Sequence, residues 1–368
     1  MYRHSKINKE KASFAALQAS LRNLALEKVS NLIGHGGFVT RRSLEQCSSE
    51  LLAEFKGNEF KGNKILILAA GLGIDDWAFS FSFNKVISID TDIELNAISR
   101  YNFGVLKRNN IQRIDANASE FLDRNSETFD LVFVDPDRRN EKGRQILLGE
   151  HQPNVVELLP KLFAISSKVL IKCSPLYDYE MAILEIPNIS TMYSVSKYGE
   201  MKELLILAEK DYSEDGISII CSDILKDKTT VTYRTLDNKE SKYSATDEIG
   251  SYLYEAGSCV VKMRKHHHLA MELNLSGIDI SVAYYTSNQI NNQFIGRCFK
   301  VTKSMKYNSK DCIKYFESKH IKKANIKARG LKFNTEELRK KLKLKEGGTD
   351  YIFALPYKNN ILLIHCTY

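Results

Sequence analysis

The chain has 368 residues, of which 43% are hydrophobic and 27% charged, with 19 Gly and only 6 Pro. This composition excludes a largely disordered, collagen-like or low-complexity protein, and the length corresponds to two or three domains. No apolar run approaches the roughly 18 residues needed to cross a bilayer, and the basic residues 1–11 lead into no apolar secretory segment. We therefore expect a cytoplasmic protein with no membrane partner.

The net charge of +8 is concentrated near the C-terminus. Residues 297–346 contain 17 Lys and Arg against 5 Asp and Glu, a net +12, whereas the remainder carries 36 positive and 40 negative side chains. A basic segment of this kind predicts an anionic, nucleic-acid-like partner. The seven cysteines are at least 14 positions apart, which excludes a CxxC metal or redox pair.

The N-terminal region, residues 10–60, is predicted to be helical. It contains no Pro, and the GHGG string at Gly34–Gly37 divides it into two helical pieces. Apolar residues follow at spacings of three and four, which places them on one face of a helix: Phe14, Leu17, Leu21 and Leu24.

From residue 61 onward, short apolar runs alternate with stretches long enough for crossover helices. Continuous apolar runs of this length are typical of parallel strands covered by helices on both faces. They predict a Rossmann-like, doubly wound α/β sheet. The runs are ILILAA (65–70), KVISID (85–90), FDLVFVD (129–135), KVLIKCS (168–174) and ELLILAE (203–209).

Beyond Asp211 the pattern predicts a smaller α+β module. GISIICSDI and TTVTYRTL are predicted as antiparallel strands, followed by a helix over 259–272. His266–His268 lie on that helix, where successive residues diverge by about 100°, so no metal site is expected there. The last elements are a strand (296–305), a helix (308–319), a strand (324–333), a helix capped by Thr335 or Asn334 and stopped by Gly347–Gly348, and a final hairpin of YIFAL and NILLIHC.

The first strand of the α/β region runs into AAGLGIDD (69–76), a strand followed by a Gly-x-Gly turn and a helix start. Gly71 and Gly73 allow a ligand to approach the backbone closely. The second strand ends at Asp90, where a carboxylate can accept both hydroxyls of a ribose. Together these features indicate a site for a nucleotide-like cofactor.

The ordered motifs ILILAAGLGIDD, VISIDTD, RIDANASEFL and FDLVFVDPDRR resemble those of class I S-adenosylmethionine-dependent methyltransferases. More narrowly, the chain resembles the bacterial THUMP-like-domain-containing methyltransferase family over residues 40–368. The strings that carry this resemblance are SLEQCSSE (43–50), DPDRR (135–139), LIKCSP (170–175), MKELLIL (201–207), YLYE (252–255) and LRKKLKLKEGG (338–348).

The resemblance implies an N-terminal helical region (1–60), a methyltransferase domain (61–255), a ferredoxin-like linker domain (256–320) and a THUMP-like domain (321–368). It implies S-adenosylmethionine as cofactor, RNA as partner and no metal. The residues it assigns to the cofactor are Gly71, Gly73, Asp75, Asp90 and Asn117.

The first motif departs from the usual methyltransferase pattern. An acidic residue normally ends the first strand, but the corresponding stretch here is Ile67, Leu68, Ala69 and Ala70. Asp75 and Asp76 are the candidates to replace it. The departure favours one alternative, a non-catalytic RNA-binding protein on a degenerate methyltransferase scaffold. A further alternative is a methyltransferase for a small molecule or a protein.

The expected reaction site follows the fourth strand. Asp135 and Pro136 occupy the place where amine methyltransferases carry acceptors that orient the target nitrogen, although the second Pro and the aromatic residue of that motif are missing. Arg138 and Arg139 suit phosphate, because guanidinium groups bind it bidentately. Lys172 is expected to complete the substrate pocket. The substrate-docking residues predicted in the basic segment are Lys340, Lys341 and Lys343.

Overall fold

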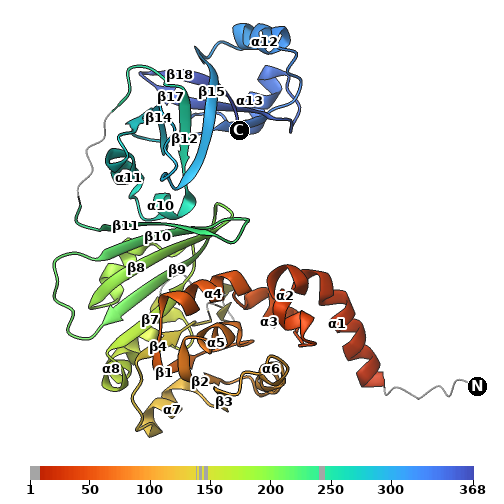
Figure 1. Ribbon diagram of the computed structural model, residues 1–368, viewed down its shortest axis with the longest axis vertical. Helices are drawn as coiled ribbons and strands as arrows, with labels where there is room; N and C mark the ends of the chain where they lie inside the picture. The colour runs from red at the N-terminus through yellow and green to blue at the C-terminus, as the bar shows by residue number, and fades with distance from the viewer. Residues whose placement is uncertain (1–8, 138, 141–142, 145–147, 240–244) are drawn as a thin grey trace, which may run out of the picture. The chain divides into compact units, whose positions relative to one another are not determined.

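The computed structural model describes residues 9–137, 139–140, 143–144, 148–239 and 245–368 (Figure 1). The chain divides into two compact units. The first consists of residues 1–195 and 202–217, and the second of residues 196–201 and 218–368.

Four helices open the described part of the first unit, in agreement with the predicted helical region. They are α1 (Lys9–Lys28), α2 (Ser30–Gly34), α3 (Arg41–Gln46) and α4 (Glu50–Glu59). The described region has four pieces where two were predicted. One reason is a capping box in which Thr40 and Ser43 satisfy each other's backbone N–H groups and begin α3.

These helices share a hydrophobic core with the α/β part of the unit. Leu21 and Leu32 are almost fully buried in one cluster with Leu72 and Trp77, which follow the first strand of the sheet. Burial of such side chains contributes on the order of 2 kcal/mol each. The N-terminal helices are thereby fixed to the sheet domain.

The sheet of the first unit has the strand order β3-β2-β1-β4-β7-β9-β8. Its strands are β1 (Gly62–Leu68), β2 (Phe83–Asp90), β3 (Ile111–Asp115), β4 (Leu131–Val134), β7 (Lys168–Cys173), β8 (Ile189–Lys197) and β9 (Glu200–Glu209). Strands β3, β2, β1, β4 and β7 pair in parallel. The order reverses beside β1, so the carboxyl ends of β1 and β4 form the switch point where such sheets bind ligands.

The remaining elements of the first unit are the helices that connect the strands and a short hairpin after β4. They are α5 (Ile74–Phe79), α6 (Ile93–Val105), α7 (Ala118–Arg124), β5 (Arg139–Asn140), β6 (Gly143–Arg144), the 3₁₀ helix η1 (Leu148–Glu150), α8 (Val155–Ile165) and α9 (Tyr179–Glu185). The doubly wound α/β fold is confirmed.

One strand of this sheet runs against the prediction. The run ELLILAE lies in β9, which pairs with β7 in the antiparallel direction. Leu204 to Ala208 are all buried. A continuous apolar run is expected of any strand covered on both faces, so it does not distinguish a parallel strand from an antiparallel one. Strand β8 was not predicted, and β3 was implied only by the motif RIDANASEFL, which precedes the predicted fourth strand. The run ISTMYSVSK of β8 contains three polar hydroxyl residues, Ser190, Ser194 and Ser196, that are nevertheless buried.

The second unit contains an antiparallel pair, β10 (Ser218–Ile224) and β11 (Thr230–Leu236), as predicted. Its main sheet has the order β13-β14-β12-β15-β18-β17-β16. These strands are β12 (Tyr252–Ala256), β13 (Ser276–Gly277), β14 (Tyr284–Ser287), β15 (Gly296–Lys306), β16 (Asn325–Ala328), β17 (Asp350–Tyr357) and β18 (Asn360–Thr367). The helices are α10 (Ser258–Lys262), α11 (His266–Glu272), α12 (Ser309–Ser318) and α13 (Thr335–Leu342).

Both faces of the main sheet of the second unit are covered by hydrophobic clusters. Successive side chains of β17 point alternately into one cluster and the other. Ile352 and Ala354 pack in one cluster with Phe316 of α12 and Leu338 of α13, the two helices seen beside β15, β17 and β18 in Figure 1. Phe353, between them in the sequence, lies in the opposite cluster. The predicted small α+β module is confirmed.

Three boundaries of the second unit differ from the prediction. The expected helix over 259–272 is two short helices, because Arg264 adopts a left-handed φ of 52° between them. The strand expected over 324–333 ends at Ala328. Helix α13 begins at the predicted cap, Asn334, but ends at Leu342, because Lys343 takes a left-handed conformation before the glycines are reached.

Candidate cofactor and active site

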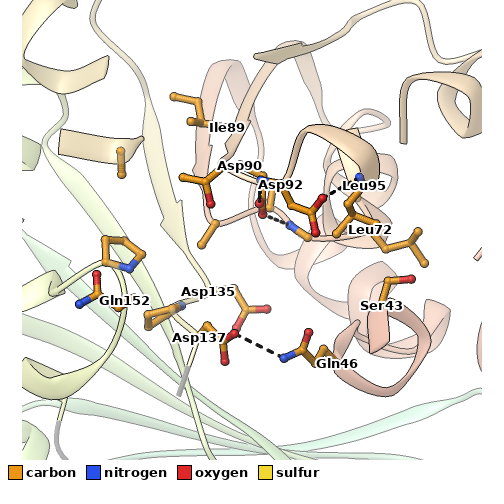
Figure 2. Close-up of a pocket in the computed structure, with 18 of the residues that line it drawn as sticks. Ser43, Gln46, Leu72, Ile89, Asp90, Asp92, Leu95, Asp135, Asp137 and Gln152 are labelled. Carbon is orange, nitrogen blue, oxygen red and sulfur yellow. Dashed lines mark hydrogen bonds between the residues drawn. The ribbon is translucent and has the colours of Figure 1, made fainter. Parts of the chain in front are cut away.

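A cavity of about 780 Å³ lies at the carboxyl edge of the parallel strands of the first unit (Figure 2). The segments that follow four neighbouring strands line it: 69–75 after β1, 89–92 after β2, 116–119 after β3 and 135–137 after β4. Residues 40–48 from the N-terminal helices and 152–158 before and within α8 supply further wall. The cavity is therefore at the position that the strand order predicts.

The loop after β1 contains the two glycines of the predicted cofactor motif, and the structure gives them different roles. Both have positive φ, 55° at Gly71 and 84° at Gly73. A Cβ on Gly71 would meet nothing within 4 Å, so this glycine leaves open space beside the cavity. A Cβ on Gly73 would lie 2.5 Å from Phe103 Cζ. Gly73 is thus needed for close packing between the loop and α6.

Asp90, at the end of β2, fixes this loop. Its Oδ2 accepts a hydrogen bond from the Gly71 N–H at 2.8 Å, and its Oδ1 accepts one from the Asp92 N–H at 3.0 Å. Each carboxylate oxygen retains a second lone pair. The carboxylate lines the cavity and remains available to accept hydrogen bonds from a ligand.

Asn117 lies in the wall after β3 and begins α7. Its side-chain oxygen accepts a hydrogen bond from the Ser119 N–H at 2.8 Å, which caps the helix. This bond fixes the amide group at the rim of the cavity. The side chain therefore has a structural role in addition to the predicted contact with adenine.

Asp135, which directly follows β4, forms an ion pair with Lys172 of β7 on the side away from the cavity. Lys172 Nζ lies 2.6 Å from Asp135 Oδ2 and 3.1 Å from Ser48 Oγ. The Lys172 side chain is only 9% exposed, whereas that of Asp135 is 27% exposed and lines the cavity. Lys172, predicted to contact substrate, thus lies beneath the cavity wall as an ion-pair partner of Asp135.

A second lysine continues this network into the core. Lys56 of α4 is fully buried, and its Nζ lies 2.5 Å from Glu203 Oε2 and 3.1 Å from Asp75 Oδ1. Ser48 accepts hydrogen bonds from Lys56 and Lys172, and its single proton is shared between Asp75 Oδ2 at 2.8 Å and Glu203 Oε1 at 3.2 Å. Two buried carboxylates and two buried ammonium groups are therefore linked to the partly exposed carboxylate of Asp135.

Burial and charge act in opposite directions on these carboxylates. Burial raises the pKa of Asp135, and the nearby charges of Asp75 and Glu203 add to this, so the attraction of Lys172 only partly offsets the rise. Burial would also raise the pKa of Asp75, but the charges of Lys56 and Lys172 outweigh it and lower that pKa. For Lys172 the order is reversed, because burial lowers its pKa and its three carboxylate neighbours raise it well above the usual value.

Asp76, the other candidate to replace the missing acidic residue, points elsewhere. Its carboxylate is fully buried and lies 3.0 Å from Arg113 Nη2. The missing position itself, Ile67, is also fully buried, in the middle of the sheet. Asp75 is in the cavity wall, although its carboxylate is only 9% exposed and is engaged by Lys56 and Ser48.

The wall contributed by the N-terminal helices was not predicted. Gln46 Nε2 donates to Asp137 Oδ2 at 3.4 Å, and Arg42 Nη2 to the same oxygen at 3.3 Å, so α3 contacts the segment after β4 (Figure 2). Ser48, Lys56 and Glu203 were also missed. Ser48 and Glu203 lie within the strings SLEQCSSE and MKELLIL, whose match to the family was the one signal that could have identified them.

Two predicted arginines and three predicted lysines remain. Arg138 is outside the described residues, and Arg139 is described only as part of β5. Lys340, Lys341 and Lys343 belong to the second unit, where α13 and its C-cap leave all three side chains exposed.

The described part of the chain has neither a membrane-spanning helix nor a metal-binding cluster. No described helix is long and apolar enough to cross a membrane. No group of three or more His, Cys, Asp and Glu side chains among these residues is arranged to hold a metal ion.

Known proteins match this chain in part and as a whole. Residues 296–367 match the family of THUMP domain-like sequences. A putative methyltransferase from Porphyromonas gingivalis W83 has the same fold, with a TM-score of 0.87 and 22% identity over 99% of this chain and 92% of that one. No curated protein sequence matches. The methyltransferase fold and the THUMP-like region implied by the resemblance are confirmed.

Other solved structures match a smaller share of the chain. An O-methyltransferase from Bacillus cereus in complex with SAH matches 54% of it, at 12% identity and a TM-score of 0.34, over 99% of its own length. A putative RNA methyltransferase from Pyrococcus horikoshii matches 53%, at 16% identity and a TM-score of 0.35, over 98% of its own length. The THUMP-like match begins at residue 296, within the range assigned to the ferredoxin-like linker, and the boundary between those two domains stays a prediction.

Proposed function

We propose that this chain is an S-adenosylmethionine-dependent methyltransferase that acts on RNA. The observation that carries the proposal is the acidic cavity at the switch point of a methyltransferase fold. Seven of the residues that line it have carboxylates, against one arginine, Arg42. The carboxylates belong to Glu45, Asp75, Asp90, Asp92, Asp135, Asp137 and Glu157.

This lining fits S-adenosylmethionine, which carries a sulfonium and an ammonium group against one carboxylate and is a net cation. Asp90 would hold the ribose, Asn117 would lie beside the adenine, and Gly71 leaves space for the approach of the ligand. When bound, the cofactor supplies an electrophilic methyl group. The carboxylate absent at Ile67 is compensated by acidic side chains that other segments bring to the same wall, which favours an enzyme over a degenerate scaffold.

RNA is the proposed substrate because of the second unit. The exposed Lys340, Lys341 and Lys343 lie within the matched THUMP-like segment, and residues 297–346 have a net charge of +12. Phosphate binding by such residues supplies most of the salt-dependent affinity for nucleic acid. The cytoplasm, where RNA and the cofactor meet, is the expected location.

Calorimetric titration with S-adenosylmethionine and with S-adenosylhomocysteine tests the cofactor directly. We expect both to bind at micromolar concentrations. A folded protein that binds neither would overturn the enzyme proposal, and retained RNA affinity in that case would select the non-catalytic scaffold.

Transfer of a labelled methyl group to total RNA from a strain that lacks the gene tests the substrate. We expect label in RNA and a modified nucleoside that is absent from the deletion strain. Label that enters only protein or small molecules, without salt-dependent RNA binding, would select the third alternative.

A further inference from the structure

The buried lysines beneath the cavity have no part in the proposed function so far. Lys172 is 9% exposed and Lys56 is fully buried, so neither can reach a substrate phosphate. A buried ammonium group is costly unless carboxylates surround it. The carboxylates around them therefore determine what these two lysines do.

Lys56 neutralises the deeper carboxylates. Its Nζ lies 2.5 Å from Glu203 Oε2 and 3.1 Å from Asp75 Oδ1, so it pairs with both acidic side chains nearest to it. Lys172 lies 3.9 Å from Glu203 Oε1 and 4.0 Å from Asp75 Oδ2, distances longer than hydrogen bonds. The short bond of Lys172 is the one to Asp135 Oδ2 at 2.6 Å.

Asp135 consequently presents its two oxygens differently. Oδ2 is committed to Lys172, and among the described residues no hydrogen bond from a side chain or backbone N–H reaches Oδ1. The carboxylate lines the cavity (Figure 2). A group that enters the cavity therefore meets a fixed acceptor oxygen.

We propose that Lys172 is a positioning residue, supported by Ser48, Lys56 and Glu203, that fixes the Asp135 carboxylate through Oδ2 and leaves Oδ1 to accept from the methyl acceptor. This inference rests on the proposed function and names its substrate class: the acceptor is an N–H or O–H group that donates to Oδ1. On methylation the acceptor forms a bond to the methyl carbon, and the bond from that carbon to sulfur breaks with its electron pair going to sulfur, so that S-adenosylhomocysteine leaves. The acceptor's N–H or O–H bond breaks with its electron pair kept by the acceptor, and the proton moves to Asp135 Oδ1.

The competing chemistry is methylation at carbon through a cysteine nucleophile. Cys47 lines the same cavity, but burial raises its pKa to about 11, and its thiol donates to Leu44 O at 3.6 Å. The thiolate is the nucleophilic form, so at neutral pH this cysteine is poorly activated. The geometry favours Asp135.

Infrared spectroscopy of the protonated carboxyl group tests the pairing without any need for activity. The band of the Asp135 carboxyl group is obtained by subtracting the infrared spectrum of Asp135→Asn from that of the wild type. Its titration is set by Lys172 from β7, Asp75 from α5 and Glu203 from β9. We expect Lys172→Met to move the midpoint to higher pH and Lys172→Arg to restore it largely. An unchanged midpoint in Lys172→Met would overturn the proposal even if the protein proves to bind no cofactor.

The pH profile of methyl transfer to RNA from the deletion strain tests the acceptor class. We expect Lys172→Met to lower transfer on the order of 100-fold at pH 7 and to regain part of it at higher pH. Lys161→Met, which removes an exposed lysine of α8, is the matched control. If Lys172→Met does not fold, Ser48→Ala replaces it as the test variant. It removes one hydrogen bond of Lys172 and should shift the pH profile in the same direction by a smaller amount. Transfer that survives in Asp135→Asn but is lost in Cys47→Ser would overturn the assignment in favour of a carbon acceptor.

Discussion

The carboxylate of Asp90 accepts the backbone N–H of Gly71 at 2.8 Å, so the end of β2 holds the loop that follows β1. The same carboxylate lines the cavity, where we expect it to accept the ribose hydroxyls. One side chain thus shapes the loop and faces the ligand. Substitution of Asp90 would disturb the loop and the ligand contact at once. Substitutions of Gly71 and Gly73 in the loop distinguish the effect on ligand binding from the effect on packing.

We predict that Gly71→Ala and Gly73→Ala differ in kind. A Cβ on Gly71 meets no atom within 4 Å, so Gly71→Ala should cost about 1 kcal/mol of stability for its positive φ while weakening S-adenosylhomocysteine binding. Gly73→Ala places its Cβ 2.5 Å from Phe103 and should cost about 3 kcal/mol. Urea unfolding and calorimetry on both variants make the comparison. Equal stability of the two would contradict it.

The buried ion network predicts a large stability loss for Glu203→Gln. This change leaves the fully buried Lys56 with Asp75 as its remaining carboxylate within 4 Å. Removal of one partner of a buried pair costs about 3 to 5 kcal/mol, measurable by urea unfolding. Glu127→Gln is the control, because it breaks the exposed pair with Lys64 and should cost under about 1 kcal/mol. A loss at Glu203 no larger than at Glu127 would refute the prediction.

The exposed lysines of the second unit predict a weaker salt dependence of RNA binding when they are replaced. The triple change of Lys340, Lys341 and Lys343 to Gln should lower the slope of log K against log salt by about 2, at roughly 0.7 per lost phosphate contact. Fluorescence anisotropy at several salt concentrations measures it. Lys61→Gln with Lys107→Gln, exposed lysines of the first unit, is the control. An unchanged slope in the triple variant would place the RNA elsewhere.

His266 predicts a loss of stability in acid. Burial lowers its pKa to about 4, with a smaller contribution from His267, and its Nδ1 lies 2.9 Å from Tyr285 Oη. Between pH 4 and the usual histidine value near 6.5 the unfolded chain binds more protons, so stability falls as pH drops through this window. The group accounts for about 2 kcal/mol after allowance for its partial exposure. His266→Gln should flatten the pH dependence of urea unfolding, whereas the exposed His35→Gln should leave it unchanged.

The sequence was most informative where one residue or one run decides the structure. Asn334 begins α13 as predicted, and the run at 65–70 forms β1 and the turn after it. The direction of β9 and the early end of α13 at Lys343 were not predictable, because burial and a single left-handed residue leave no periodic signal.

The candidate site was predictable along one edge of the sheet. Asp90, Asn117 and Asp135 each follow a strand, and the fold brings them to one cavity. Ser48, Lys56 and Glu203 come from an N-terminal helix region and a distant strand, with contacts across as many as 155 positions. Nothing in local sequence patterns reports such pairings.

The pairing of Lys56 with Glu203 also bears on the order in which the first unit folds during synthesis. The two residues are 147 positions apart, so the lysine leaves the ribosome long before its carboxylate partner exists. Until β9 has emerged, Lys56 lacks the nearer of its two buried carboxylate partners, so burial of its charge stays costly. We therefore expect α4 to pack fully onto the sheet only after β9 has been synthesised.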